Sequence, residues 1–325
     1  MRKELFAKTG NWYKGNLHSH TTNSDGRLTP AEAVKLYKSY GYHFLCLSEH
    51  DVFTDLRAQF DSREFILLPG VEASATLLGD SGATAKKTHH IHGILGTQAM
   101  QKAAGPHVFR HGERLSPPVY TGEWNGLEVA QRLSDSLREK GCFTTYNHPA
   151  WSRVETDEVV GLRNIWAVEI YNYGTVVECG EGYDSVFWEA MLRKGTHVCG
   201  FASDDNHNPG RFFDSLGGYV MVRSEELSHE AIVKHLLAGD YYFSAGPRIF
   251  QWGIEENRVF VECSDVARIN FIAGGAVGRS ETVLRHVDPL RGAYHELRGD
   301  ETYVRVECVD DRGQTAWTNP LWLRD

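Results

Sequence analysis

The sequence predicts an α/β protein in which a parallel barrel is followed by a small antiparallel β-sandwich. Up to about residue 247, short apolar runs alternate with helical segments, and polar clusters follow the runs at their C-terminal ends. This pattern is typical of parallel α/β barrels. From residue 248 onward, short alternating runs are separated by turn residues, as in antiparallel sheets. We therefore expect two domains, residues 1–247 and residues 248–325.

Composition limits the classes of function. The chain has 325 residues, 41% of them hydrophobic, which is enough for a sizeable core. Its formal net charge of -9 argues against a surface that coats long nucleic acid. No apolar run is long enough for a membrane span, and the N-terminus lacks a signal-peptide pattern. Six scattered cysteines without a Cys-x-x-Cys motif predict reduced, buried thiols, so we expect a cytoplasmic protein.

The elements of the barrel follow in order. A first strand leads into residues 16–20, and a helix begins at Thr29 with a proline in its first turn and Glu32 placed for a capping box. Further strands are predicted at 44–47, 65–72, 89–96, 142–146, 167–171, 197–202 and 219–222. Further helices are predicted at 126–140, 183–194 and 228–238. Residues 97–125 lack a clear period, so we interpret them as a lid or substrate loop.

The C-terminal module is predicted to be a β-sandwich of roughly 75 residues, close to the lower limit for an independent core. Its strands are expected at 250–254, 258–263, 269–272 and 303–308.

Histidines and carboxylates at the strand ends form the candidate site. His18 and His20 alternate along a strand, so their side chains share one face and can bind one ion. The other candidates are Asp25, His50, Glu72, His90 or His92, His148, Asp205 and His207. Burying so many ionisable groups costs several kcal/mol, and bound cations are the natural compensation.

Taken in order, these segments resemble the PHP (polymerase and histidinol phosphatase) family of metallophosphoesterases over about residues 12–225. The matching motifs are HSHTTNSDG (18–26), SEHD (48–51), GVE (70–72), NHP (147–149) and ASDDNH (202–207). The resemblance implies a distorted seven-stranded (β/α) TIM-like barrel with two or three divalent ions of manganese, iron or zinc. The C-terminal module, which ends in Ala316–Trp322, looks like that of CehA/McbA-type metallohydrolases, a subgroup with carbamate-hydrolysing members.

The resemblance also implies how the ligands divide among the ions. The first ion takes His18, His20 and Asp205, and Glu72 bridges it to the second. The second ion also takes His148 and His90, with His92 in reserve. The third takes Asp25, His50 and His207. Two positions depart from the family pattern: Glu49 replaces an aspartate, and Asp25 stands where some members have histidine. The second departure favours manganese or iron over zinc at the third site.

Several neighbouring residues have two interpretations. Asp51 and Asp204 either orient a ligand imidazole or cap the following turn. Arg211 is a candidate for binding phosphate through two parallel hydrogen bonds. Arg110, His111 and Arg114 in the long excursion are candidates for substrate contact.

The leading hypothesis is a metal-dependent phosphoesterase for a small phosphorylated molecule. No Gly-x-Ser-x-Gly motif is present, so water is the expected nucleophile. The third ion, or Asp25 and His207 beside it, is expected to stabilise the leaving oxygen. The alternative enzyme is an ester, amide or carbamate hydrolase, because aromatic residues near the strand ends suit an apolar substrate: Trp124, Trp151, Tyr171 and Tyr173. A third hypothesis is a metal-binding module without catalysis. The sequence leaves the oligomeric state open.

Overall fold

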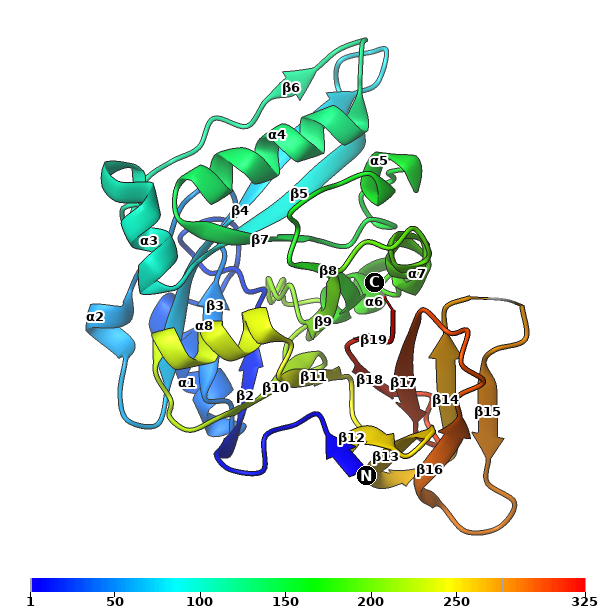
Figure 1. Ribbon diagram of the computed structural model, residues 1–325. Coiled ribbons are helices and arrows are strands. Elements are labelled where there is room, and N and C mark those ends of the chain that lie inside the picture. The colour runs from blue at the N-terminus through cyan, green and yellow to red at the C-terminus, as the bar shows by residue number, and fades with distance from the viewer. Residues whose placement is uncertain (1, 276, 325) are drawn as a thin grey trace.

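The computed structural model describes residues 2–275 and 277–324, which form a mixed α/β fold (Figure 1). The first strands are β1 (Arg2–Glu4), β2 (Asn11–Asn16), β3 (Phe44–Leu47), β4 (Ile66–Leu78), β5 (Ala85–Leu95), β6 (Val119–Tyr120), β7 (Cys142–Tyr146), β8 (Ala167–Asn172), β9 (Cys199–Ser203), β10 (Tyr219–Ser224) and β11 (Tyr241–Ser244). The helices are α1 (Pro30–Ser39), α2 (Arg57–Phe60), α3 (Gln98–Ala104), the 3-10 helix η1 (Gly105–His107), α4 (Gly126–Glu139), α5 (Asp157–Val160), α6 (Tyr173–Cys179), α7 (Ser185–Arg193) and α8 (His229–Ala238). No helix in these two ranges is long and apolar enough to cross a bilayer.

The strands before residue 247, which we call the first part, include a run in the order β10-β2-β3-β4-β5-β7-β8-β9. The neighbours from β2 to β4 and from β7 to β9 are parallel, as the sequence predicts. A closed (β/α)7 barrel is not found among the described residues, so this expectation is corrected. Strand β9 approaches β11 without pairing, and side chains satisfy the backbone N and O of Gly200 on this side. Gly200 N donates to Asn319 Oδ1 at 2.9 Å, and the Tyr241 hydroxyl donates to Gly200 O at 2.8 Å.

The β4–β5 hairpin is the second departure from a parallel barrel. The two strands pair in antiparallel register over most of their length and project beyond the rest of the sheet (Figure 1). In this register Glu72 lies opposite His92, and Ser74 opposite His90. Opposite residues of an antiparallel pair point to the same face. The histidines near the middle of β5 therefore reach the carboxyl ends of the parallel strands, which a parallel β5 would not allow.

The predicted helices form for local reasons. Thr29 caps α1 and forms the expected capping box with Glu32, and the helix buries Ala33 and Tyr37. Ser228 caps the start of α8, and Gly239, with a φ of 78°, ends it. The excursion at 97–125 contains α3, η1 and β6, and β6 pairs with β4. It is thus part of the framework around the hairpin.

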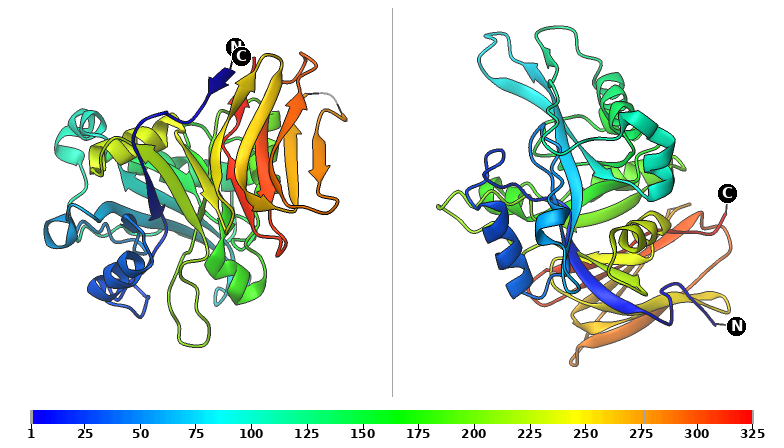
Figure 2. Two further views of the ribbon diagram at one scale, coloured as in Figure 1. Left: turned by 90° about the horizontal axis from the view of Figure 1, so that it is seen from below. Right: turned by 90° about the vertical axis from the view of Figure 1, so that its left-hand side faces the viewer.

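The C-terminal part is a two-sheet sandwich that lies to one side of the first part (Figure 2). Its strands are β12 (Ile249–Glu255), β13 (Arg258–Val266), β14 (Arg268–Ala273), β15 (Glu281–Leu284), β16 (Leu290–Glu296), β17 (Tyr303–Val309), β18 (Thr315–Thr318) and β19 (Leu321–Trp322). One sheet has the order β1-β12-β13-β16, and the other continues the large sheet because β18 pairs with β11. The proposed boundary after residue 247 therefore falls between β11 and β12, within a structure whose two parts share a sheet.

Candidate metal centre

Glu72 is the centre of a buried cluster of imidazoles. Its side chain is fully buried, and five histidines place a ring nitrogen within 3.4 Å of its carboxylate oxygens. These histidines are His18, His20, His50, His90 and His148. They come from segments far apart in the sequence, so only the tertiary fold brings them together.

Asp205 forms the opposite side of the cluster. Its Oδ1 lies 3.0 Å from His18 Nε2 and 3.1 Å from His20 Nε2, and these two nitrogens are 3.1 Å apart. The backbone holds the two segments in register, because Asp205 N donates to His18 O at 3.0 Å and His20 N donates to Asn206 O at 3.1 Å. Four donor residues, His18, His20, Glu72 and Asp205, offer ligand atoms within 4.8 Å of one another.

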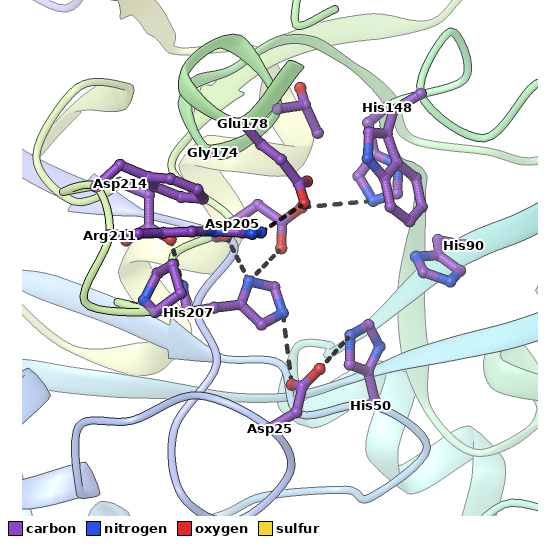
Figure 3. Close-up of a pocket in the computed structure, with 14 residues that line it drawn as sticks. Asp25, His50, His90, His148, Gly174, Glu178, Asp205, His207, Arg211 and Asp214 are labelled. Carbon is purple, nitrogen blue, oxygen red and sulfur yellow. Dashed lines mark hydrogen bonds and ion pairs between the residues drawn. The ribbon is translucent and has the colours of Figure 1, made fainter.

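A second group lies toward the cavity around Asp25 (Figure 3). The Asp25 carboxylate lies 3.6 Å from His50 Nε2 and 3.4 Å from His207 Nε2. His20 Nδ1 faces the same carboxylate at 3.9 Å, so His20 has one ring nitrogen directed toward each group. The structure thus brings together all nine residues proposed as ligands from the sequence.

His90 and His92 differ in their access to this cluster. His90 Nδ1 lies 3.4 Å from Glu72 Oε1, and the ring lines the cavity. His92 Nε2 lies 3.8 Å from the same oxygen, and its ring packs edge-on against His18 at 4.2 Å. His90, His50 and Glu72 form a possible three-residue metal group. His90 is thus the one of the two that lines the cavity, while both ring nitrogens of His92 are also buried without a hydrogen-bond partner among the described residues.

Two of the residues stand on left-handed backbone. His148 follows β7 with a φ of 25°, and Asp205 follows β9 with a φ of 52°. Such conformations cost of order 1–3 kcal/mol in residues other than glycine and are concentrated at functional sites. The strain aims both side chains into the cluster.

Hydrogen bonding inside the cluster is incomplete. Several buried atoms that point into it have no hydrogen-bond partner in the described ranges, namely His20 Nδ1, Glu72 Oε2, His90 Nδ1 and Asp205 Oδ1. Leaving a buried polar group without a partner typically costs about 1–3 kcal/mol. Imidazole and carboxylate donors together suit zinc, iron or manganese, so the residues present fit divalent ions.

The ionisation of the cluster points the same way. Burial raises the pKa of Glu72 and Asp205, but His18 lowers it, and both pKa values end well below the usual range. Burial lowers the pKa of His148 and His207, yet hydrogen bonds to Glu72 and Asp25 raise these values to about 8 and about 9, respectively. Burial lowers the pKa of His90 and His92 instead, so positive charge, as protons or as cations, is favoured at His148 and His207 beside the carboxylates.

Three acids that adjoin proposed ligands in the sequence, Glu49, Asp51 and Asp204, accept hydrogen bonds from backbone N–H groups. Asp51 accepts hydrogen bonds from Ser74 N at 3.0 Å and Ser74 Oγ at 2.8 Å. Asp204 accepts from the backbone of the turn at residues 216–218, at 2.7 to 2.8 Å. Glu49 accepts from Thr21 N at 3.0 Å and from Ser24 Oγ at 2.6 Å, which ties down the loop that carries Asp25. Among the contacts of the described residues, neither Asp51 nor Asp204 caps the turn that directly follows it or bonds to a ligand imidazole: Asp51 ties down β4, and Asp204 ties down residues 216–218.

A cavity of about 330 Å³ opens onto the cluster. Arg211 lies at its edge with a side chain that is 72% exposed, and one guanidinium nitrogen is 3.7 Å from Glu178 Oε1 (Figure 3). Trp151 lines another part of the wall, and its ring packs edge-on against His148 at 5.0 Å. The other aromatic candidates, Trp124, Tyr171 and Tyr173, do not line this cavity. His111 and Arg114 line a separate pocket beside α1 and α2, and Arg110 lines neither pocket.

Sequence reasoning missed several polar residues that support the cluster. Glu169 contacts His18, Asn147 donates to Glu72 at 2.9 Å, and Asn172 donates to Asp205 at 3.0 Å. A charged residue inside the apolar run Ala167–Tyr171 is the signal that points to Glu169, because buried acids need partners. The two asparagines directly follow or end strands, where the sequence alone does not separate a cap from a site residue.

No protein-family model and no curated protein sequence matches the chain. Among solved structures, it is similar to a two-domain protein from Bacteroides vulgatus that contains a predicted PHP-like metal-dependent phosphoesterase. That similarity has 14% identity and a TM-score of 0.46, over 98% of each chain. An amidohydrolase from Chromobacterium violaceum is similar over 70% of this chain and 96% of its own, with 16% identity and a TM-score of 0.43. At these TM-scores, similarity in shape does not establish a common fold.

Proposed function

We propose that this chain is a metal-dependent hydrolase that acts on a small phosphate ester. The buried cluster around Glu72 and Asp205 carries this proposal, because its donor atoms converge and several of them lack partners among the described residues. The cluster opens onto a cavity with an arginine at its edge. The order of the motifs, which resembles that of PHP metallophosphoesterases, supports the same reaction class.

Each part of the site has a role in this proposal. His18, His20, His90, His148, Glu72 and Asp205 would hold ions in the buried part, and Asp25, His50 and His207 beside the cavity. Divalent ions bound there would lower the pKa of a water molecule and neutralise charge on the phosphoryl oxygens. Arg211 would bind a phosphate oxygen at the edge of the cavity. The pair formed by Asp25 and His207 would stabilise the leaving oxygen.

Water is the proposed nucleophile because the cavity offers no activated side-chain alternative. Neither serine nor cysteine is among the described residues that line it. Its one hydroxyl residue, Thr175, is 3% exposed and donates to Asn172 O at 3.2 Å.

Substitution of Asp205 by asparagine tests the metal-dependent step. An amide at this position turns an N–H group toward either the His18 and His20 nitrogens or Asn172, and it removes a negative charge. We expect Asp205→Asn to lose bound metal and to lower hydrolysis of p-nitrophenyl phosphate by at least about 100-fold, the upper end of losses seen for residues that only support a metal site. Metal content and turnover are measured after chelation and after return of manganese, iron or zinc.

The phosphate proposal is contradicted if metal-loaded protein cleaves p-nitrophenyl acetate but neither p-nitrophenyl phosphate nor the diester bis-p-nitrophenyl phosphate. Bound metal with no turnover of any of the three would support a metal-binding module without catalysis.

A second candidate is an ester, amide or carbamate hydrolase that uses the same ions. The position of Trp151 favours it, because an aromatic ring beside His148 suits an apolar substrate. Glu178 also partly neutralises the charge of Arg211, which makes that side chain less available to a phosphate. For a phosphate ester, we expect Arg211→Ala to lower kcat/KM by about 10-fold or more, as for loss of one charge-assisted hydrogen bond, and Trp151→Ala to have the smaller effect. The reverse order on a neutral ester would favour the second candidate. Metal content must stay unchanged in both variants.

A further inference from the structure

We propose that Glu169 is a positioning residue that fixes the tautomer of His18 and the place of His148 in the metal cluster. The proposal rests on the metal-binding function proposed above, and it assigns a role that the sequence motifs do not contain. Glu169 lies on β8, inside the fold, with a fully buried side chain.

The carboxylate of Glu169 has four hydrogen-bond partners, three of which are fixed as donors. Oε1 lies 2.9 Å from His18 Nδ1 and accepts a hydrogen bond from Ser203 Oγ. Oε2 accepts from the backbone N of His148 at 3.0 Å and from Asn172 Nδ2 at 2.9 Å. A carboxylate has about four lone-pair positions, so this acceptor capacity is used up.

This pattern separates Glu169 from the proposed ligands. Glu72 and Asp205 each keep one buried oxygen without a partner in the part of the chain that the structure describes, and that oxygen is available to an ion. Glu169 has none to spare. Glu169 lies in a group with His18 and His148 whose atoms are close enough to share an ion. Because its oxygens are already occupied by four hydrogen-bond partners, we assign it the role of holding His18 and His148 in place.

The contact with His18 decides which nitrogen of that ring faces the cluster. When Nδ1 carries the proton and donates it to Glu169, Nε2 keeps its lone pair toward Asp205 and Glu72, at 3.0 and 3.2 Å. A ligand imidazole commonly donates its second N–H to a carboxylate, which sets the tautomer and raises ligand basicity. Glu169 occupies this position for His18.

The contact with His148 holds a strained backbone. His148 has a φ of 25°, and the hydrogen bond from its N–H to Glu169 helps to offset the cost of that conformation. Asn172 extends the link, since its Nδ2 contacts both Glu169 and Asp205 Oδ2 at 2.9 and 3.0 Å. One carboxylate is thus connected to three proposed ligands.

The Glu169→Gln variant tests the proposal with little change in volume. Three of the four partners of the carboxylate are fixed as donors, so the new amide NH₂ faces either one of these or His18. If it faces His18, that ring is driven to the Nε2–H tautomer, which cannot bind an ion through Nε2. We expect affinity for Zn²⁺ or Mn²⁺ to fall about 10- to 100-fold, the usual cost of losing such support. Competition with a chromophoric chelator measures it.

Two controls show whether the loss is specific. Glu189→Gln changes another largely buried carboxylate, which contacts Tyr303 and Arg305 away from the cluster, and metal affinity should stay within about twofold. Ser203→Ala removes one donor to Glu169 but keeps the carboxylate, so we expect only a small effect. If Glu169→Gln does not fold, Glu169→Asp replaces it: the shorter side chain keeps its charge but cannot reach His18 and His148 together.

A spectroscopic readout separates positioning from general stability. In zinc-loaded wild type, ¹⁵N correlations of histidine side chains should show His18 with its proton on Nδ1, and in Glu169→Gln this signal should shift or split. Unchanged zinc affinity and an unchanged His18 tautomer would overturn the proposal. Absence of tight metal binding in the wild type would instead contradict the proposed function, so the two failures are distinguishable.

Discussion

Single carboxylates in this protein differ in what their oxygens contact. Asp204 accepts several backbone N–H groups, Glu49 accepts from Thr21 and Ser24, and Glu169 is fully satisfied. Glu72 and Asp205 instead retain an oxygen without a partner among the described residues, facing imidazoles. In the sequence four of these acids stand at or near the ends of predicted strands, and Glu169 stands inside one. Which of them is free to bind an ion depends on donors that come from distant segments.

His229, at the start of α8, should make the thermal stability of the protein depend on pH. Burial and the nearby Arg57 lower its pKa to about 4, while a hydrogen bond with the Leu95 backbone and the charges of Glu230 and Asp55 oppose the shift. Because the pKa of His229 is lower in the folded than in the unfolded state, where it is about 6.5, the folded state favours the neutral ring. Its contribution to the free energy of unfolding is therefore complete above pH 6.5 and is lost as the pH falls toward 4. We expect the fall in Tm between pH 6.5 and 4.5 to be smaller in His229→Gln than in the wild type.

His235, on the same helix, is the matched control. Burial lowers its pKa, but hydrogen bonds to Asp240 and Glu225 raise it to a net value above normal. Its stabilisation is complete below the unfolded pKa and is lost as the pH rises through the folded pKa. His235→Gln should therefore lose stability mainly at low pH. An identical pH profile in the wild type and His229→Gln would contradict the prediction.

Among the elements, the β4–β5 hairpin contributes most to the site. The sequence predicts a strand at 89–96, but read as one more parallel strand it places His90 and His92 at the wrong end of the sheet. The antiparallel return of β5 solves this, because it sets His92 opposite Glu72 and His90 one pair further along the same face. Strand direction depends on the connection and on long-range pairing, so the apolar run alone did not reveal it.

Helix α6 is absent from the sequence prediction, and its residue Gly174 packs against the backbone that carries Asp205. Gly174 N donates to Asp204 O at 2.7 Å, and a Cβ at this position would meet Asp204 O at 2.7 Å and Asp205 O at 2.8 Å. The clash is with backbone next to a proposed ligand. We expect Gly174→Ala to destabilise the fold by about 1–3 kcal/mol, as overpacking does, and to weaken metal binding.

Gly79→Ala is the control for this effect, since a Cβ there would meet Thr84 only at 3.5 Å, an ordinary contact. Its unfolding free energy and metal affinity should match those of the wild type. Equal metal affinity in Gly174→Ala would show that α6 and the Asp205 turn are not coupled.

In the whole molecule, the large sheet passes from the first part into the sandwich. Strand β11 pairs with β10 on one side and with β18 on the other, and Phe243 on β11 stacks on Trp317 of β18 at 5.4 Å. Arg305 on β17 and Glu189 on α7 form a buried ion pair at 3.0 Å across the same junction. The sandwich therefore completes the fold of the first part.

A chain truncated after residue 247 tests this dependence. Removing β18 leaves β11 as an open edge, exposes the buried Phe243 ring and leaves Glu189 without Arg305. Open apolar edges promote aggregation, and breaking a buried ion pair costs about 3–5 kcal/mol. We expect the fragment to be insoluble or to unfold well below the full chain in thermal denaturation. A soluble fragment with wild-type metal affinity would contradict this and would support 1–247 as an independent domain.

The sequence by itself determined the local features of this protein. The capping box of α1, most strands and helices and the change of pattern near residue 248 follow from periodicity, turn chemistry and residue type over short stretches. The candidate ligands follow in the same way, except that only the family resemblance prefers His90 to His92. The tertiary structure alone decided the direction of β5, the open edge at β9, the shared sheet and the role of Glu169. The reason is physical: these features depend on hydrogen bonds between separate segments of the chain, and a short stretch of sequence does not show which segments will meet.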